Sequence, residues 1–150
     1  MKKVLLVFAG LVAVAVVLLI FRGGAGGGGL ELSGNDARQV GDLTVDFLED
    51  IQFKDFEKAS SYHSAEDRKK VNIPKLIERL FAVKPEFLDI MRYELVKVDV
   101  DRSGNRARVK THTVVKILNT GEIKEPDIIF YWYKDPAEGW VMELESSLHR

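Results

Sequence analysis

The sequence predicts an α+β fold, in which N-terminal helices pack on a curved four-strand antiparallel meander that follows a single N-terminal transmembrane helix. Three observations lead to this prediction. An unbroken apolar run occupies residues 4–21, apolar residues then recur at helical spacing from about residue 36, and from about residue 93 they alternate with polar ones. The chain of 150 residues therefore divides into an anchor at 1–22, a linker at 23–34 and one domain at 35–150.

Composition excludes several classes of protein. The chain has no cysteine, which excludes disulfides, thiolate metal sites and thiol catalysis. Three basic residues lie beside the apolar run, so the remainder carries 19 basic against 23 acidic residues, a net charge of −4. An acidic domain is a poor candidate for binding nucleic acid, and no nucleic-acid partner is expected.

The apolar run predicts a membrane anchor. Its 18 residues would form a helix roughly 27 Å long, close to the thickness of the hydrocarbon layer. Lys2 and Lys3 outweigh the one arginine after the run, so the domain is expected outside the inner cell membrane, facing the periplasm or the exterior. The alternative is a cleaved signal peptide and a secreted domain, but the bulky Ile20 and Phe21 do not suit a cleavage site.

The glycine-rich segment 23–29 predicts a flexible tether between anchor and domain. A phosphate-binding loop is the alternative reading of such a tract. That loop would need a lysine and a preceding strand, and the segment has neither.

Four helices are predicted, each starting at a capping residue or a proline. The first is capped by Asn35 or Asp36 and has an apolar stripe of Val40, Leu43, Phe47, Leu48 and Ile51. The others start at Asp55 (with Phe56, Ala59 and Tyr62), at Pro74 (with Leu76, Ile77, Leu80 and Phe81) and at Pro85 (with Phe87, Leu88 and Met91).

Four strands are predicted at about 93–101, 106–118, 127–133 and 139–148, and each turn between them contains glycine or asparagine. Three hairpins in sequence give one consistent apolar face. The pairs that create it are Val100–Ala107, Val98–Val109, Thr113–Ile128, Thr111–Phe130, Val109–Trp132, Trp132–Trp140, Phe130–Met142 and Ile128–Leu144.

The apolar face, beneath the helices, supplies the candidate ligand-pocket residues. These are Thr111, Thr113, Phe130, Trp132, Trp140 and Met142. Since only the threonines are polar, this set predicts a packed core or an apolar pocket and no acid–base site. No catalytic residue is assigned. His63 is expected to be a surface or capping residue, and the three histidines lack metal-ligand spacing, so neither a metal nor a cofactor is expected.

The opposite face of the sheet is predicted to be a partner surface. Its candidate residues are Asp99, Arg108, Lys110, His112, Ile129, Tyr131 and Tyr133, with Val141 and Glu143 completing the face. The expected register puts Asp99, Arg108 and Tyr133 in one row, Lys110 beside Tyr131, and Lys97 opposite Lys110. Two tyrosines and an isoleucine make this face amphipathic, which is typical of surfaces that bind proteins.

Two segments carry a family resemblance. Residues 45–59 (VDFLEDIQFKDFEKA) with Tyr62, and residues 131–142 (YWYKDPAEGWVM), resemble the opening helices and closing hairpin of the nuclear-transport-factor-2-like superfamily, the cystatin-like α+β cone. The resemblance covers roughly residues 36–148 and rests on patterns of shape. It implies a domain of a kind that frequently dimerises through the sheet. An anchor joined to such a domain is also similar to envelope scaffold proteins of type IV secretion systems.

The sequence therefore favours a non-enzymatic, membrane-tethered extracytoplasmic domain that binds a protein partner or forms a homodimer through the outer sheet face. One alternative is a small apolar ligand binder or enzyme that uses the cone between helices and sheet. Another is a spacer or immunity-type protein with one dedicated partner. The Lys69-Lys70 pair reads most simply as a solvated loop, although it could contact acidic headgroups if the tether is short.

Overall fold

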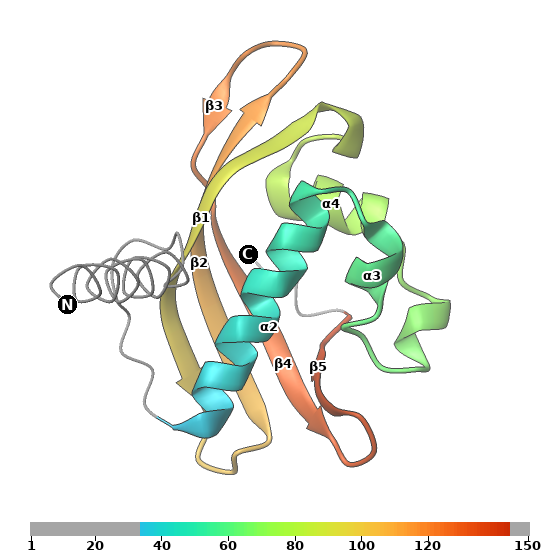
Figure 1. The fold of residues 1–150 in the computed structure, drawn as a ribbon, viewed down its shortest axis with the longest axis vertical. Helices are drawn as coiled ribbons and strands as arrows, with labels where there is room; N and C mark the ends of the chain where they lie inside the picture. Colours follow the sequence, from blue (N-terminus) through green and yellow to red (C-terminus); the bar gives the residue numbers. More distant parts are fainter. Residues whose placement is uncertain (1–33, 145–150) are drawn as a thin grey trace, which may run out of the picture.

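The computed structural model describes residues 34–144. Helices come first and a curved antiparallel sheet follows, which confirms the α+β class (Figure 1). The elements are α2 (Asn35–Gln52), α3 (Phe56–Ser60), the 3₁₀ helix η1 (Asp67–Lys69), α4 (Ile73–Phe81), the 3₁₀ helix η2 (Pro85–Phe87), β1 (Leu88–Val100), β2 (Arg106–Ile117), β3 (Ile123–Lys124), β4 (Asp127–Asp135) and β5 (Gly139–Met142).

The predicted anchor at 1–22 lies outside the described residues, as does nearly all of the linker. None of the helices between residues 34 and 144 has the length and apolar character needed to cross a membrane. The end of the predicted fourth strand, after residue 144, also lies outside the described part of the chain.

The first helix starts differently from the prediction. Gly34 is the N-cap residue of α2, with no side-chain cap, so capping by Asn35 or Asp36 is wrong. The carboxylate of Asp36 instead accepts hydrogen bonds from Lys134 Nζ at 3.0 Å and from Trp140 Nε1 at 3.1 Å. These bonds lower the pKa of Asp36, the one from Trp140 most strongly. The first turn of α2 is thereby joined to the β4–β5 hairpin.

Two of the three shorter helices form as the sequence predicts, and the third does not. Asp55 caps α3, as predicted, by accepting from Lys58 N at 3.0 Å. Pro74 lies in the first turn of α4, also as predicted. The helix expected from Pro85 is only the 3₁₀ turn η2, because Leu88 and Met91 already belong to β1. The edge strand thus begins five residues before the predicted start.

The sheet has the order β1-β2-β4-β5, with every neighbouring pair antiparallel and β3 paired to β2. β3 and β4 follow one continuous register along β2. The gap between them falls at Pro126, which has no N–H to give to the ladder. Its carbonyl still accepts from Thr113 N at 3.0 Å. The predicted meander is therefore correct, and its third strand is β4, with the short strand β3 as an addition before it.

The registers keep the predicted faces and change the predicted partners. Val98 pairs with Val109, as expected. Val109 then faces Phe130 where Trp132 was expected, and Trp132 faces Met142 where Trp140 was expected. Both differences are shifts of two residues. Because side chains alternate with a period of two, an even shift leaves every inward residue inward.

Two irregularities curve β1. The register against β2 shifts at Met91 and again at Val96, as in β-bulges. Both residues are apolar and yet exposed, at 55% and 41%. Each bulge reverses the alternation, so the residues that face the core are Leu88 and Ile90, then Tyr93 and Leu95, then Val98 and Val100.

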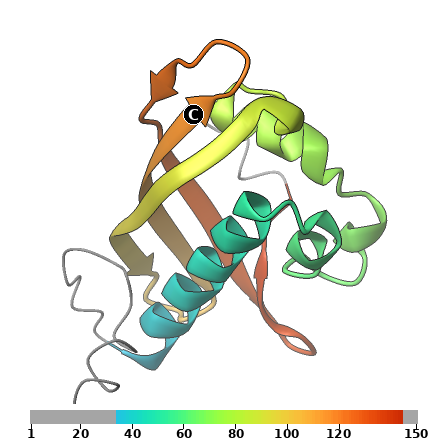
Figure 2. The ribbon, with the colours of Figure 1, turned by 45° about the horizontal axis from the view of Figure 1, so that its top comes forward.

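The core lies between α2 and the inner face of the sheet. α2 crosses that face diagonally, and α3 and α4 lie beside it on the side of β5 (Figures 1 and 2). Phe47 of α2 meets Phe130 edge-on at 5.6 Å between ring centroids and Tyr62 at 5.8 Å. Tyr62 in turn lies edge-on to Trp132 at 6.5 Å. This packing leaves the opposite face of the sheet free of α2.

Candidate interaction surface

The outer face of the sheet is built by alternate residues of four strands. Asp99 of β1 pairs with Arg108 of β2, which pairs with Tyr131 of β4. Glu143, just after β5, donates its backbone N–H to Tyr131 O at 2.9 Å and so ends this row. The neighbouring row pairs Arg106 with Tyr133. An acidic, a basic, an aromatic and another acidic residue thus lie side by side across the face.

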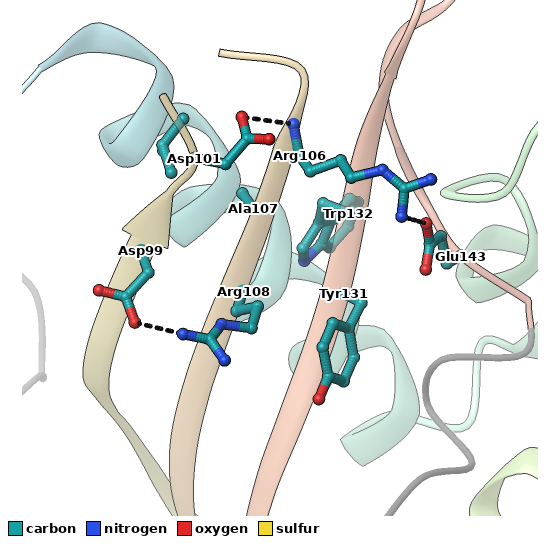
Figure 3. Close-up of a pocket in the computed structure, with 9 residues that line it drawn as sticks. Asp99, Asp101, Arg106, Ala107, Arg108, Tyr131, Trp132 and Glu143 are labelled. Carbon is teal, nitrogen blue, oxygen red and sulfur yellow. Dashed lines mark hydrogen bonds and ion pairs between the residues drawn. The ribbon is translucent and has the colours of Figure 1, made fainter. Parts of the chain in front are cut away.

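The cations at this end of the face form ion pairs with carboxylates on the same face (Figure 3). Arg106 Nη1 lies 3.1 Å from Glu143 Oε1, and Arg108 Nη2 lies 3.5 Å from Asp99 Oδ2. Lys97 also reaches Asp99, at 3.1 Å. These pairs are exposed, so each contributes little to stability, and together they set three cations against two carboxylates.

The middle of the face holds a second charged group. Lys97 does pair with Lys110, as predicted, but Lys110 Nζ lies 3.0 Å from Asp127 Oδ2, which compensates the like charges. His112 Nδ1 lies 2.8 Å from Asp127 Oδ1. The hydrogen bond to Asp127 raises the pKa of His112, and the bonds from His112 and then Lys110 lower the pKa of Asp127.

A groove of about 500 Å³ opens on the outer face at the β1–β2 turn (Figure 3). It is lined by Asp99, Val100, Asp101, Arg106, Ala107, Arg108, Tyr131, Trp132 and Glu143. Asp101 fixes one end, because its carboxylate accepts from Ser103 Oγ at 2.7 Å and from Arg106 N at 3.3 Å. The hydrogen bond from Ser103 is the main reason that the pKa of Asp101 is lowered. The charged residues at the rim of the groove are therefore of both signs and are held by hydrogen bonds and ion pairs.

Apolar surface accompanies these charges along β4. Ile129 is 38% exposed, and Tyr131 and Tyr133 are half-buried. Val141, which pairs with Tyr133 on the same face, is only 4% exposed. β5 thus adds little apolar surface here, and the apolar strip along β4 consists of Ile129, Tyr131 and Tyr133.

The structure brings the predicted partner-surface residues together on one face but rearranges its rows. Tyr131, where Tyr133 was predicted, lies beside Arg108, and Lys110 faces Ile129 where Tyr131 was predicted. Arg106 was not predicted as a site residue. The alternation along β2 from Arg108 and Lys110 would have found it, because the outward residues of a strand recur at every second position.

The six predicted ligand-pocket residues are all buried on the inner face. Thr111 Oγ1 donates to Ile128 O at 3.3 Å, and Thr113 Oγ1 donates to Pro126 O at 2.9 Å. The indole N–H groups of Trp132 and Trp140 donate to Thr44 and Asp36. A polar ligand entering this region would have to replace hydrogen bonds that the protein already makes.

His63 lies in the interior, so its prediction as a surface or capping residue is wrong. It is 1% exposed and forms a parallel bridge with Met142. Its Nδ1 lies 3.3 Å from Ser60 O, while Nε2 is buried without a hydrogen-bond partner within residues 34–144. Burial lowers the pKa of His63, which favours the neutral ring. The burial of His63 depends on its contact with β5, much later in the chain, and no pattern in the neighbouring sequence indicates that contact.

Within the described part of the chain, no three histidine, aspartate or glutamate side chains are grouped closely enough to hold a metal ion. A comparison with protein-family models finds no match for this sequence, and a comparison with curated proteins finds none either. The resemblance to the nuclear-transport-factor-2-like superfamily therefore stays a prediction.

Proposed function

We propose that this chain is a non-enzymatic, membrane-tethered domain that works outside the cytoplasm and binds a protein partner or a second copy of itself. The binding surface is the outer sheet face around β4 and the groove beside it. The tether is the apolar run at 4–21 with the glycine-rich segment 23–29.

The observation that carries this proposal is the half-buried state of Tyr131 and Tyr133 on a face that α2 does not cover (Figure 1). Tyrosine is favoured at protein interfaces because it supplies a large apolar ring with a polar tip. Ile129 extends the same strip. A strand facing only water would more commonly present polar side chains here.

The charges beside the strip fit the same role. Arg106 and Arg108 are already paired with Glu143 and Asp99, so they can frame an apolar contact without requiring counter-charges from the partner. A polar rim around a less polar centre is the usual anatomy of such an interface. This arrangement favours protein recognition over the capture of an anion.

The rival function, a small apolar ligand bound inside the cone, has weaker support. The residues that would line that site are buried, and the polar groups of Thr111, Trp132 and Trp140 are hydrogen-bonded within the protein. Nothing else in the described residues favours this function over the first.

The test is the double variant Tyr131→Glu and Tyr133→Glu of the full chain in a mild detergent. Sedimentation velocity should show a smaller assembly or the loss of a bound partner, while circular dichroism shows an unchanged fold. The matched control is Leu118→Glu with Ile123→Glu, two exposed apolar residues flanking the β2–β3 turn. The proposal fails if the tyrosine variant keeps the fold, the association state and the partners of the original chain.

A further inference from the structure

A second groove, of about 330 Å³, lies beside α4. It is lined by Lys70, Val71, Asn72, Lys75, Leu76, Arg79 and Leu144. Three of these residues are cationic and none is acidic. The groove therefore has a single sign of charge, unlike the outer-face groove with its alternating charges.

The cations come from two elements that converge on the groove. Lys75 and Arg79 are four residues apart on α4 and so lie on the same side of the helix. Both are exposed, and neither forms an ion pair within residues 34–144. Lys70, which follows η1, pairs with Glu66 at 3.0 Å on the exposed surface, where such a pair is weak and easily exchanged.

The rest of the lining is apolar. Leu76 is buried, Val71 and Leu144 are half-buried, and Asn72 is occupied in capping α4, where its Oδ1 accepts from Lys75 N at 3.0 Å. An apolar lining beneath two unpaired cations suits an anion that also carries hydrocarbon. A simple inorganic anion would leave the apolar part of the groove unused.

We propose that this groove binds the phosphate of an acidic phospholipid, with Lys75 and Arg79 as the main ligands and Lys70 as the third. The proposal rests on the proposed function, because the linker at 23–34 would hold the domain within about 40 Å of the bilayer. α2 is roughly 27 Å long, and α4 lies toward the end of α2 that is farther from the linker (Figure 1). The groove can thus reach the membrane surface when the domain lies on its side.

The experiment places the full chain in nanodiscs of phosphatidylcholine, or of phosphatidylcholine with one third phosphatidylglycerol, and measures lysine acetylation by mass spectrometry. Acetylation of Lys70 and Lys75 should slow roughly fivefold with phosphatidylglycerol, which is the effect expected from one cation near an acidic surface. Lys116 and Lys124, which lie outside the groove, should be acetylated at unchanged rates.

Variants make this test specific. Lys75→Glu with Arg79→Glu should abolish the protection of Lys70. Arg102→Glu with Lys116→Glu changes the net charge equally at exposed positions away from the groove and should preserve it. Circular dichroism checks that both variants are folded.

Four outcomes would overturn the proposal. The first is that phosphatidylglycerol does not slow acetylation of Lys70 and Lys75, and the second is that it slows acetylation of Lys116 and Lys124 equally. The third is that glycerol 1-phosphate added to phosphatidylcholine discs protects Lys70 and Lys75 as well as phosphatidylglycerol does. The fourth is that a hexaglutamate peptide protects these lysines while phosphatidylglycerol does not. The third would assign the groove to free phosphates, and the fourth to an acidic protein. If the tether itself is wrong, the chain will not co-elute with the discs, and phosphatidylglycerol vesicles then give the same measurement.

Discussion

The indole N–H of Trp132 donates a hydrogen bond to the hydroxyl of Thr44, 3.0 Å away and 88 residues earlier in the chain. Both residues are fully buried. Thr44 Oγ1 passes the bond on to Val40 O, at 2.8 Å, within α2. A polar link through the middle of the core thus fixes how α2 lies across β4, and it accounts for every polar atom of these two side chains.

Replacing Thr44 by valine should remove this link and destabilise the domain. The indole N–H of Trp132 would stay buried without an acceptor, a loss of about 1–3 kcal/mol in the free energy of unfolding. Urea unfolding of Thr44→Val measures the loss, and Thr44→Ser, which keeps the hydroxyl, should lose less. In a Trp132→Phe background the valine substitution should cost clearly less, because no donor remains to be stranded. Equal costs in both backgrounds would contradict the role of the bond.

His63 should make the domain less stable in mild acid. Burial lowers its pKa below the ordinary value of about 6.5, so the unfolded chain binds a proton more readily than the folded one. Stability is then fully present above that ordinary pKa and decreases as the pH falls through 6.5 toward the lower pKa of the folded state. Urea unfolding between pH 7.5 and 5 should show this decrease, and His63→Leu should flatten the profile. An equally steep profile in the variant would show that other groups cause it.

The faces of the sheet could be predicted from sequence because they depend only on alternation. Val98, Val109, Phe130, Trp132 and Met142 all point to the core, as the pattern requires. The pairing could not be predicted equally well. A shift of two residues preserves every face, so the register is decided by the lengths of the turns, and hydrophobic alternation does not report those lengths.

Features that depend on contacts between distant parts of the chain could not be predicted from the sequence. Met91 and Val96 are apolar residues that bulges turn away from the core, and nothing in their neighbours predicts a bulge. His63 is buried only because β5 returns to pair beside it. The residues of the outer face could be predicted as a set, because that prediction needs only the alternation. The row that places Arg108 beside Tyr131 depends on the register, which the alternation does not give.

The pKa of His112 should be shifted in the direction opposite to that of His63. Its hydrogen bond with Asp127 raises its pKa above about 6.5, so the stability that the pair contributes is present below that pH and is lost as the pH rises through the pKa of the folded state. An NMR titration of the imidazole resonances should therefore give His63 a pKa below 6.5 and His112 a pKa above it. Asp127→Asn should lower the pKa of His112 and leave that of His63 unchanged. If the pKa of His112 is the same in Asp127→Asn as in the original chain, the hydrogen bond with Asp127 is not what raises it.

Tyr62 should keep its proton far into the alkaline range. Its hydroxyl donates to the buried Asp50 carboxylate at 2.8 Å, and burial, followed by that carboxylate, raises its pKa strongly. Since the unfolded phenol ionises near pH 10, the domain should lose stability as the pH rises above that value. Tyr62→Phe should reduce this alkaline dependence, to which Tyr93 also contributes because burial raises its pKa. The variant should also cost about 1.5–3 kcal/mol at neutral pH, the usual value for a hydrogen bond to a charged group. Urea unfolding at pH 7 and pH 11 measures both effects. Tyr133→Phe, on the outer face, is the matched control, and a similar response from it would refute the role of the Tyr62–Asp50 bond.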